Sequence, residues 1–400
     1  MSLNETPSGE RVHIAFFGLR NAGKSSLVNA VTGQNLSIVS EVKGTTTDPV
    51  SKAMELLPLG PVVIIDTPGL DDVGELGELR VKRALNVLAK SDIAVLVHDA
   101  GENFTQAEND LVKLFETRHL PFIIAYNKID LLENVSAENV NELKGENVIY
   151  VSALTGENIN ALKEKLASLA KSKSSSKKLI ADLLKPGDVV ILVIPVDKAA
   201  PKGRLILPQQ QTIRDILDAR CSAFVCQDTE LSHALEKITP ALVVTDSQVF
   251  EKVNAIVPQN ILLTSFSILF ARYKGNLKAL VNGAEKLSQL KDGDKVLISE
   301  GCTHHRQCGD IGTEKIPAWV KIFTRTNPEF SFTSGGEFPD VDTLKSFSLI
   351  IHCGGCMLNE QEMLSRLERA ELAGVPIVNY GVAIAQMHGI LQRSLEPFNL

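Results

Sequence analysis

The sequence predicts an α/β protein with three successive domains, each built on a mainly parallel sheet. Three observations support this prediction. Short apolar runs alternate along the chain with amphipathic segments, which is the pattern of parallel strands joined by crossover helices. A glycine-rich turn at 18–25 connects the first apolar run, 12–17, to the first helical segment. The stretch 171–178 contains only lysine and serine, and it therefore marks a boundary between domains.

Composition and charge argue against several classes of protein. A formal net charge of −7 disfavours a general nucleic-acid binder, because phosphate backbones select clustered cations. We find no charged-plus-apolar leader and no apolar run near the ~18 residues that a membrane helix needs. We therefore expect a cytoplasmic protein that binds neither nucleic acid nor membrane. In that compartment the six cysteines are expected to be thiols or metal ligands rather than disulfides.

The glycine-rich turn reads G-x-x-x-x-G-K-S and lies between a predicted strand and a predicted helix. In this context the backbone N–H groups at the helix start point at a phosphate group. We expect Lys24 to reach the β- and γ-phosphates and Ser25 to ligate Mg²⁺. The predicted nucleotide contacts of this loop are Gly18, Asn21, Ala22, Gly23, Lys24, Ser25 and Ser26.

Two later stretches are suited to sensing a γ-phosphate. In the polar stretch 44–48 we expect Thr46, or failing it Thr45, to bind Mg²⁺ and the γ-phosphate. An apolar run ends at Asp66, whose carboxylate can hold Mg²⁺ directly or through water, and the Gly69 N–H can meet the γ-phosphate. The predicted catalytic residues are therefore Lys24, Thr46, Asp66 and Gly69.

Predicted strands at 122–126 and 148–151 lead into two stretches suited to binding a base. The first reads N-K-I-D, and its aspartate can accept hydrogen bonds from N1–H and the 2-amino group of guanine, which selects guanine over adenine. The second reads S-A-L, and its backbone can meet the guanine O6. Five such motifs in order, each after a predicted strand, predict GTP and GDP binding. The predicted base contacts are Asn127, Lys128, Asp130, Ser152, Ala153 and Leu154.

Together these motifs resemble the translation-factor-related small GTPases, especially the tRNA-modification and ribosome-assembly branch with its G-T-T-x-D loop. The resemblance covers roughly residues 11–170 and implies a P-loop GTPase fold for the first domain, 1–170. Leu70 stands where Ras-like enzymes carry a water-orienting glutamine. Asn21 matches the asparagine that helps hold K⁺ beside the phosphates in potassium-activated relatives. The resemblance thus implies slow, potassium-stimulated hydrolysis of GTP to GDP and phosphate.

The stretch 171–178 is predicted to be a solvated linker, with an RNA-binding basic patch as the sharper alternative. The next domain, 179–262, has the pattern of a further α/β unit without a catalytic signal, so we interpret it as a dimerisation module. Cys221 and Cys226 lie in this domain. Cys226 is part of an apolar strand, and we expect both to be small core residues rather than metal ligands.

The third domain, 263–400, carries cysteines and histidines at the ends of two predicted strands, 295–299 and 347–351. Doubly wound sheets build their sites at strand ends, so cysteines far apart in the sequence can meet there. Three thiolates with nearby imidazoles suit either a closed zinc site or a four-iron cluster. In the second case a histidine, an oxygen ligand or an exogenous molecule would complete the fourth iron.

The pattern C-x-H followed by H-C-x-x-C, on a chain that opens with a GTPase domain, resembles the FeFe-hydrogenase maturation GTPases over its whole length. This resemblance implies a 4Fe-4S cluster held by three cysteines. Asp310 stays open as an oxygen ligand for the fourth iron, beside two histidines. The residues predicted to bind metal are Cys302, Cys353, Cys356, His304 and His352, with Ser25 and Thr46 for Mg²⁺.

By this resemblance the chain is a GTP-hydrolysing scaffold or carrier that acts as a homodimer. It would accept a transient diiron precursor cluster from two radical-SAM maturases and deliver it to the FeFe-hydrogenase apoprotein. Hydrolysis would gate partner association through loop ordering. Two other hypotheses stay open: a ribosome- or tRNA-associated GTPase with structural zinc, and a GTPase switched by the redox state of its cluster.

Overall fold

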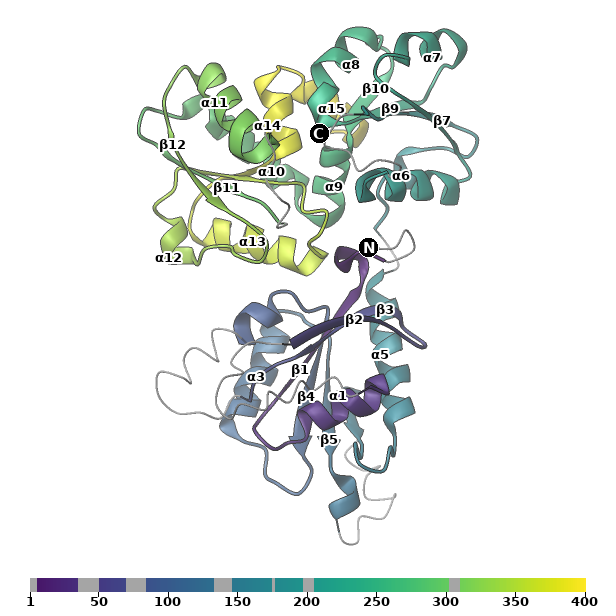
Figure 1. Ribbon diagram of the computed structural model, residues 1–400, viewed down its shortest axis with the longest axis vertical. Coiled ribbons are helices and arrows are strands. Elements are labelled where there is room, and N and C mark those ends of the chain that lie inside the picture. Colours follow the sequence, from purple (N-terminus) through teal and green to yellow (C-terminus); the bar gives the residue numbers. More distant parts are fainter. Residues whose placement is uncertain are drawn as a thin grey trace. The chain divides into compact units, whose positions relative to one another are not determined.

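The computed structural model describes residues 6–34, 50–69, 84–132, 146–174, 177–196, 205–301 and 310–400. It divides the chain into two compact units, 1–176 and 177–400, which are described separately (Figure 1). The division falls within the stretch predicted to be a linker. Helix α5 continues to Ser174, so the first residues of that stretch are helical. Lysine is a good helix former, and its charge alone does not end a helix.

The first unit is built on a six-stranded sheet of order β2-β3-β1-β4-β5-β6. Only β2 runs antiparallel to its neighbour β3, and the other pairs are parallel. The strands are β1 (Val12–Gly18), β2 (Val50–Leu56), β3 (Gly60–Asp66), β4 (Ile93–Asp99), β5 (Phe122–Asn127) and β6 (Val148–Tyr150). The helices whose bounds are described are α1 (Lys24–Thr32), α3 (Gln106–Thr117) and α5 (Ile159–Ser174).

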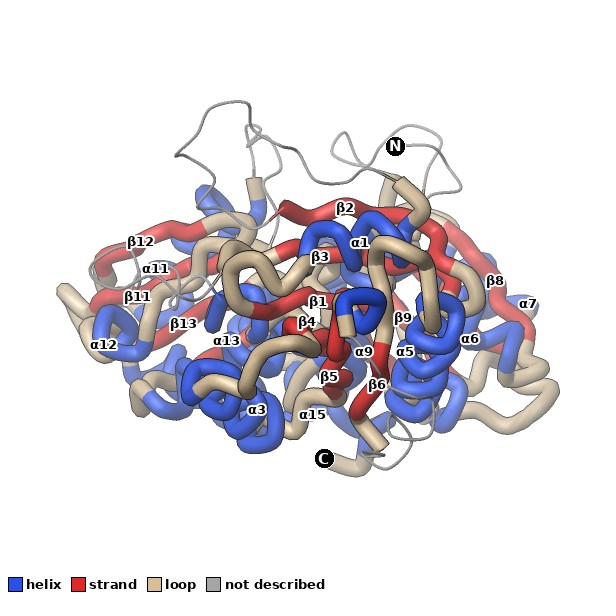
Figure 2. The backbone as a smooth tube through the Cα atoms, turned by 90° about the horizontal axis from the view of Figure 1, so that it is seen from below, coloured by secondary structure: helices blue, strands red, loops and turns tan. Residues whose placement is uncertain are grey.

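The helices of this unit cover both faces of its sheet (Figure 2). Alternate residues of β1 point to opposite faces: Ile14 and Phe16 pack with α1 and α5, whereas Ala15 and Phe17 pack with α3. This two-sided burial accounts for the continuous apolar runs of the central strands. It also places the carboxyl ends of the parallel strands, and the loops that follow them, at one edge of the sheet.

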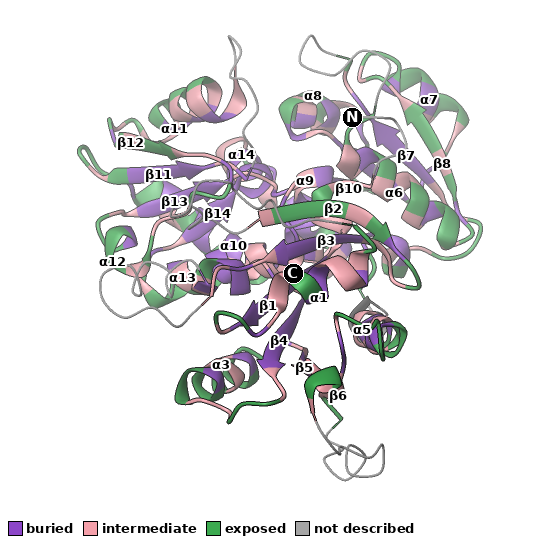
Figure 3. Ribbon diagram, turned by 60° about the horizontal axis from the view of Figure 1, so that its bottom comes forward, coloured by how far each residue is buried: buried purple, intermediate pink, exposed green. Residues whose placement is uncertain are grey.

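The edge strand β2 was not among the strands predicted from the sequence. Its residues are largely exposed, Lys52 and Glu55 among them, and most of β2 carries the colour of exposed residues in Figure 3. A polar edge strand lacks the apolar run that marks a buried one, and its antiparallel partner β3 supplies the pairing that holds it.

The second unit contains two four-stranded parallel sheets, of order β10-β9-β7-β8 and β12-β11-β13-β14. The strands are β7 (Val189–Val193), β8 (Ser222–Cys226), β9 (Leu242–Thr245), β10 (Leu262–Ser265), β11 (Lys295–Ser299), β12 (Glu329–Thr333), β13 (Leu349–His352) and β14 (Ile377–Asn379). The helices are α6 (Leu207–Asp218), α7 (Leu231–Lys237), α8 (Phe250–Ile256), α9 (Phe266–Lys274), α10 (Leu277–Glu285), α11 (Ile316–Thr324), α12 (Val341–Leu344), α13 (Glu360–Leu372), α14 (Tyr380–Met387) and α15 (Leu391–Leu395).

Helix α9 belongs to both halves of the second unit. Phe266 and Leu269 pack in the core of the sheet that contains β7, whereas Ile268 and Ala271 join the larger core shared with the sheet that contains β11. Strand β10, which precedes α9, pairs with β9 in the first of these sheets. Residue 263, the predicted start of the third domain, therefore lies inside β10, in the sheet that contains β7.

No helix in the described parts of the chain is both long enough and apolar enough to cross a bilayer.

Candidate functional site

The phosphate loop connects β1 to α1 and depends on left-handed backbone conformations. Asn21 has φ 67° and Gly23 has φ 82°. A Cβ atom built on Gly23 would lie 2.3 Å from Nδ2 of Asn127, so only glycine fits there. Gly23 is also the N-cap of α1 and offers no side chain to the first N–H groups of the helix. Those groups are thereby left to a phosphate.

Lys24, Ser25 and Asp66 meet where β3 ends beside the start of α1. The Ser25 hydroxyl donates to Oδ2 of Asp66 at 2.7 Å, and Nζ of Lys24 lies 3.3 Å from Oδ1 of the same carboxylate. This Oδ1 is buried and accepts no hydrogen bond from the described residues. Mg²⁺ prefers oxygen ligands, and the Ser25 hydroxyl lies beside a carboxylate oxygen of Asp66 that accepts no hydrogen bond from the described residues. Ser25 and Asp66 therefore fit the ion.

Asn127 ties three loops of the nucleotide site together. It lies at the end of β5 and is 1% exposed. Its Nδ2 donates to the carbonyl of Ala22 at 3.0 Å, and its Oδ1 accepts the N–H of Ala153 at 3.0 Å. The phosphate loop and the two predicted base-binding stretches therefore share one buried amide.

The base-binding stretches are held by two further polar contacts. Lys128, with φ 67°, places Nζ 2.6 Å from Oδ2 of Asp99, and the Ser152 hydroxyl donates to Oδ1 of Asp130 at 2.5 Å. Partial burial raises the pKa of Asp99, but the hydrogen bonds from Lys128 and the Gly101 N–H and the Lys128 charge outweigh it, so the net pKa is lowered. Asp99, at the end of β4, was not predicted. It is paired with Asn127 at the end of β5, so the expectation that these two strands are neighbours could have pointed to it.

The remaining residues predicted to bind the nucleotide differ in exposure, and some of them lie outside the described residues. Asn21, Ser26 and Leu154 are exposed, as expected for groups that meet a ligand or solvent. Gly18 has φ 157°, and a Cβ atom on it would lie 2.4 Å from the carbonyl oxygen of Val97. Gly69 lies within the described residues, whereas Thr45, Thr46 and Leu70 lie outside them.

The cysteine loop, residues 353–358, follows β13 in the second unit. Strand β13 pairs with β11 so that Ser299 is opposite His352, and the Cys353 N–H donates to the Ser299 carbonyl at 2.9 Å. The Sγ of Cys353 accepts the N–H of Gly301 at 3.0 Å and that of Gly355 at 3.4 Å. Such N–H donors stabilise a sulfur that carries negative charge, which is the form that ligates metal.

Gly301 brings the end of β11 against the cysteine loop. A Cβ atom on this glycine would lie 2.7 Å from Cγ of Leu358. The residue that follows it is Cys302, which, like His304, lies outside the described residues. Within the described residues, no group of three or more His, Cys, Asp or Glu side chains is placed to hold a metal ion. The structure therefore has two of the three predicted cysteine ligands on one loop, and the third directly follows Gly301, whose N–H reaches that loop.

His352 is fully buried, and both of its ring nitrogens have partners. Nδ1 lies 2.6 Å from the Cys353 carbonyl, and Nε2 lies 3.0 Å from Nη1 of Arg366. Because a guanidinium group only donates, Nε2 is the acceptor and Nδ1 carries the proton. Burial and, secondarily, the Arg366 charge lower the pKa of His352 to about 3, although the bond to Cys353 opposes the shift. The imidazole is therefore neutral at neutral pH.

Arg366 is itself buried and was not predicted from the sequence. Its Nη2 donates to the Gly335 carbonyl at 2.7 Å and to Oε1 of Glu362 at 2.8 Å, and its guanidinium carbon lies 5.2 Å from the centroid of the Phe338 ring. No sequence motif distinguishes a helical arginine whose side chain is buried from one whose side chain is exposed to solvent.

Asp310 and Glu300 bracket the segment 302–309. Oδ2 of Asp310 accepts the N–H and the hydroxyl of Thr313 at 2.9 and 2.8 Å and so caps the turn 311–315. Tyr380 donates its hydroxyl to Oε1 of Glu300 at 3.2 Å, and burial, with the Cys353 and Glu300 charges, raises the pKa of the Tyr380 phenol. Asp310 thus has a structural role that occupies one of its two oxygens.

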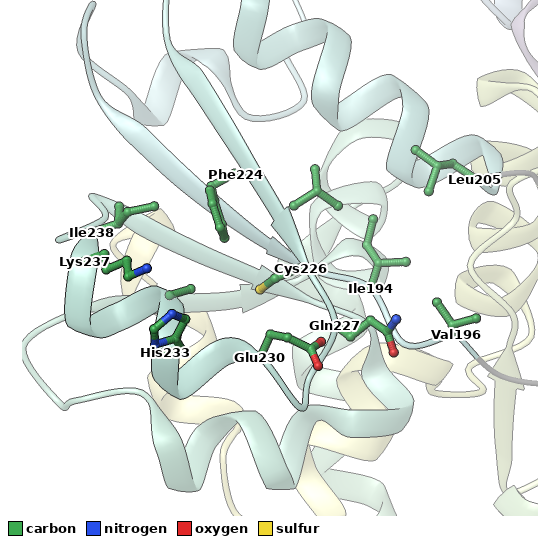
Figure 4. A pocket seen from close by; sticks show the side chains of 12 residues that line it. Ile194, Val196, Leu205, Phe224, Cys226, Gln227, Glu230, His233, Lys237 and Ile238 are labelled. Atoms are coloured by element: carbon green, nitrogen blue, oxygen red, sulfur yellow. The ribbon is translucent and has the colours of Figure 1, made fainter.

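A separate apolar hollow lies beside the edge strand β8 (Figure 4). It has a volume of about 580 Å³ and is bounded by β8, α7 and the chain on either side of them. Phe224 and Val225 of β8 line it and are 39% and 44% exposed, and two charged residues also line it: Glu230, the N-cap of α7, and Lys237, the last residue of that helix.

Comparison with known proteins agrees with the geometry of the first unit. The family described as "50S ribosome-binding GTPase" matches residues 13–128. "GTPase Der" of Thermomicrobium roseum is 35% identical over 171 residues, covering 38% of this chain and 37% of the relative. "tRNA modification GTPase MnmE" of Chromobacterium violaceum is 32% identical over 161 residues, covering 40% and 35%. The G domain of the T. maritima FeoB iron transporter is 27% identical over 40% of this chain and 99% of that one, with a TM-score of 0.31. The chain spans just over a third of the length of the GTPase Der and MnmE relatives.

The fold and the site of the first unit define a P-loop GTPase domain. The second unit identifies the family more narrowly. The hydrogen maturase F dimerization domain matches residues 179–275, and the hydrogen maturase F tetramerization domain matches residues 278–397. With a GTPase domain preceding both, the chain belongs to the hydrogen maturase F (HydF) family.

Proposed function

We propose that this chain is a GTP-hydrolysing scaffold that binds a 4Fe-4S cluster and delivers a diiron precursor to apo FeFe-hydrogenase. The observation that carries this proposal is the combination of a GTPase domain with two hydrogen maturase F domains, the second of which contains the cysteine loop. The two N–H groups donated to Cys353 Sγ support it, because they favour the anionic sulfur that ligates iron.

In the nucleotide site, Lys24 would neutralise charge on the β- and γ-phosphates, and Ser25 with Asp66 would hold Mg²⁺. Asp130 would select guanine, while Asn127 keeps the phosphate loop and the base loops in register. Thr46 and Gly69 would contact the γ-phosphate. Asn21, exposed and next to the phosphate site, would help bind K⁺, so that the cation offsets charge developing between the phosphates.

The potassium proposal is tested by measuring kcat of the full chain in KCl and in NaCl at equal ionic strength. We expect at least a tenfold faster rate in KCl and loss of this difference in Asn21→Ala. Equal rates in the two salts would overturn the potassium role and leave the GTPase assignment intact.

In the second unit, Cys302, Cys353 and Cys356 would hold the cluster, which supplies an iron open to an exchangeable ligand. The chain's own residues orient and shield that site: β11 presents Gly301 to the sulfur of Cys353, and Arg366 holds His352 against the Cys353 carbonyl. The fourth ligand stays a choice among His304, His352, Asp310 and an exogenous molecule. In this structure His352 would have to release Arg366 to become a ligand.

The cluster is tested by EPR of anaerobically reconstituted, dithionite-reduced protein, with iron, sulfide and zinc assayed on the same sample. We expect a reduced four-iron signal and about four irons per chain, lost in Cys353→Ser. Cys221→Ser is the matched control, since Cys221 is a buried thiol that donates to the Lys185 carbonyl at 3.1 Å, outside the loop. Stoichiometric zinc without a signal would overturn the proposal.

That outcome would favour a second function, a ribosome- or tRNA-associated GTPase with structural zinc. The description of the family that matches residues 13–128 and the similarity to MnmE keep this alternative in view.

The protein also carries the family's dimerization and tetramerization domains. We propose a homodimer, formed through the exposed edge strand β8, whose Val225 and Phe224 would be covered by a second copy. Val225→Asp should raise the monomer fraction at least tenfold in size-exclusion chromatography with light scattering. Leu372→Asp, on the exposed face of α13, serves as the control. The two radical-SAM maturases and the apo-hydrogenase would be the partners that exchange the diiron cargo.

A further inference from the structure

The cysteine loop directs three of its carbonyl groups at one buried lysine. Nζ of Lys274 lies 2.8 Å from the Leu358 carbonyl, 3.2 Å from that of Cys356 and 3.5 Å from that of Gly355. A lysine ammonium group has three donors, so these carbonyls can use all of them. The same loop aims an N–H, that of Gly355, at the sulfur of Cys353. The loop therefore presents carbonyl oxygens to the lysine and an N–H donor to the sulfur.

Burial of Lys274 is nearly complete, at 3% exposure, and its Nζ lies 5.7 Å from the centroid of the Phe270 ring. Removing an ammonium group from water is costly unless other groups offset its charge. Three carbonyl dipoles and an aromatic face offset part of it. Thiolates on the loop would offset more, because they bring negative charge close to the lysine.

We propose that Lys274 is a positioning residue for the iron–sulfur site, which fixes the backbone of residues 355–358 and stabilises the negative charge of a cluster held by Cys353 and Cys356. This inference rests on the proposed cluster function. Since net charge and nearby charges set the potential of such clusters, the lysine also makes the cluster easier to reduce.

Lys274 reaches the cysteine loop from another domain. It is the last residue of α9, inside the part of the chain that matches the dimerization domain, whereas the loop belongs to the tetramerization domain. The cluster site is therefore supported from its neighbour, and no spacing within the cysteine motif reveals that support.

The test compares reconstituted full-length Lys274→Met and Lys274→Gln with wild type. Lys278→Met is the matched control, since Lys278 is an exposed lysine at the start of α10. At the wild-type midpoint potential, we expect the reduced fraction, measured by EPR, to fall from one half to about one tenth in both variants, a roughly tenfold change in the redox equilibrium. Release of iron to a chelator should accelerate at least tenfold in Lys274→Met and less in Lys274→Gln, which keeps a donor for the carbonyls.

A purely structural lysine would lower the melting temperature without moving the potential, and that result would overturn the inference, as would variants that match Lys278→Met. If Lys274→Met does not fold, the potential of Lys274→Gln decides. A wild-type protein that takes up no iron would instead overturn the proposed function, so the two failures are distinguishable.

Discussion

The nucleotide site and the cysteine loop both follow the carboxyl ends of parallel strands, yet they are held in different ways. In the first, the functional residues support one another: Ser25 and Lys24 meet Asp66, and Asn127 connects Ala22 to Ala153. In the second, residues outside the motif hold it in place. Lys274 and Arg366, both buried and cationic, contact the loop and His352 from two different helices.

This difference explains why the nucleotide site can be predicted from the sequence, whereas the surroundings of the cysteine loop can be predicted only in part. A phosphate site made of backbone conformations needs glycine and a few polar residues at fixed spacings, and those spacings form a motif. A thiolate site needs positive charge and N–H donors from any direction. The fold can supply these from distant positions, which leave no local pattern.

The largest effect should come from the motif itself. Lys24→Ala removes the cation that contacts the phosphates, and we expect kcat for GTP hydrolysis to fall about 10³-fold with little change in stability. Lys113→Ala, at an exposed position of α3, is the control. A loss of less than tenfold would mean that the loop does not act as the phosphate site.

Arg366→Met should cause the largest loss of stability. It strips hydrogen bonds from His352, Gly335 and Glu362 in a buried setting, so we expect about 3 kcal/mol of destabilisation in urea unfolding of the apoprotein. Arg214→Met is the matched control: it also breaks an i,i+4 pair, with Asp218, but the pair is exposed and should cost under about 0.5 kcal/mol. If Arg366→Met and Arg214→Met lowered the free energy of unfolding equally, Arg366 would not have the special stabilising role that its buried contacts predict.

Asn127→Ala should both destabilise the fold and weaken nucleotide binding. It leaves the Ala22 carbonyl and the Ala153 N–H without their partner, which should cost about 2 kcal/mol of stability and weaken GTP binding about tenfold. Calorimetric titration with GTP measures the second quantity. Asn109→Ala, whose side chain bonds to the Thr105 carbonyl on exposed α3, should change neither.

The smallest effect concerns Asp99. Its pKa is lowered in the folded chain, so its pairing with Lys128 stabilises the fold above the ordinary carboxyl pKa, and this contribution is lost as the pH falls from that value through the lowered pKa. Because the pair is partly exposed, Asp99→Asn should cost under about 1 kcal/mol near neutral pH and nothing once the pH is below the lowered pKa. Thermal melts of wild type and variant, from neutral pH to well below the ordinary carboxyl pKa, would show the two curves converge at the acid end; curves that stay parallel would contradict the pairing.

Much of the fold followed from sequence because buried parallel strands are continuous apolar runs. Strands β1, β3, β5, β11 and β13 were predicted for this reason. Strand β2 was missed because it is polar and pairs at an edge. Residues 171–174 were predicted to belong to a solvated linker because of their charge and serine content, whereas they continue α5, since helix formation depends on backbone propensity.

The site residues also divide into those that belong to a local sequence motif and those that do not. The phosphate and guanine motifs placed their residues at neighbouring loops, as the contacts of Asn127 show. Asp99, Arg366 and Lys274 were not predicted, since a lone charged residue in a helix or at a strand end is usually solvated. Their roles follow only from burial and from the partners that the fold brings to them.

Helix α9 has a consequence for how the second unit unfolds. One of its faces packs in a core on the sheet that contains β7, and the other packs in the larger core that this sheet shares with the sheet that contains β11, so both cores depend on the helix. Loss of either sheet would expose large apolar side chains of the same helix to water. We therefore expect residues 177–400 to melt in a single calorimetric transition, with equal van't Hoff and calorimetric enthalpies. The two domains would then be inherited as a pair, since a recombination event between them would split a shared helix from half of its packing.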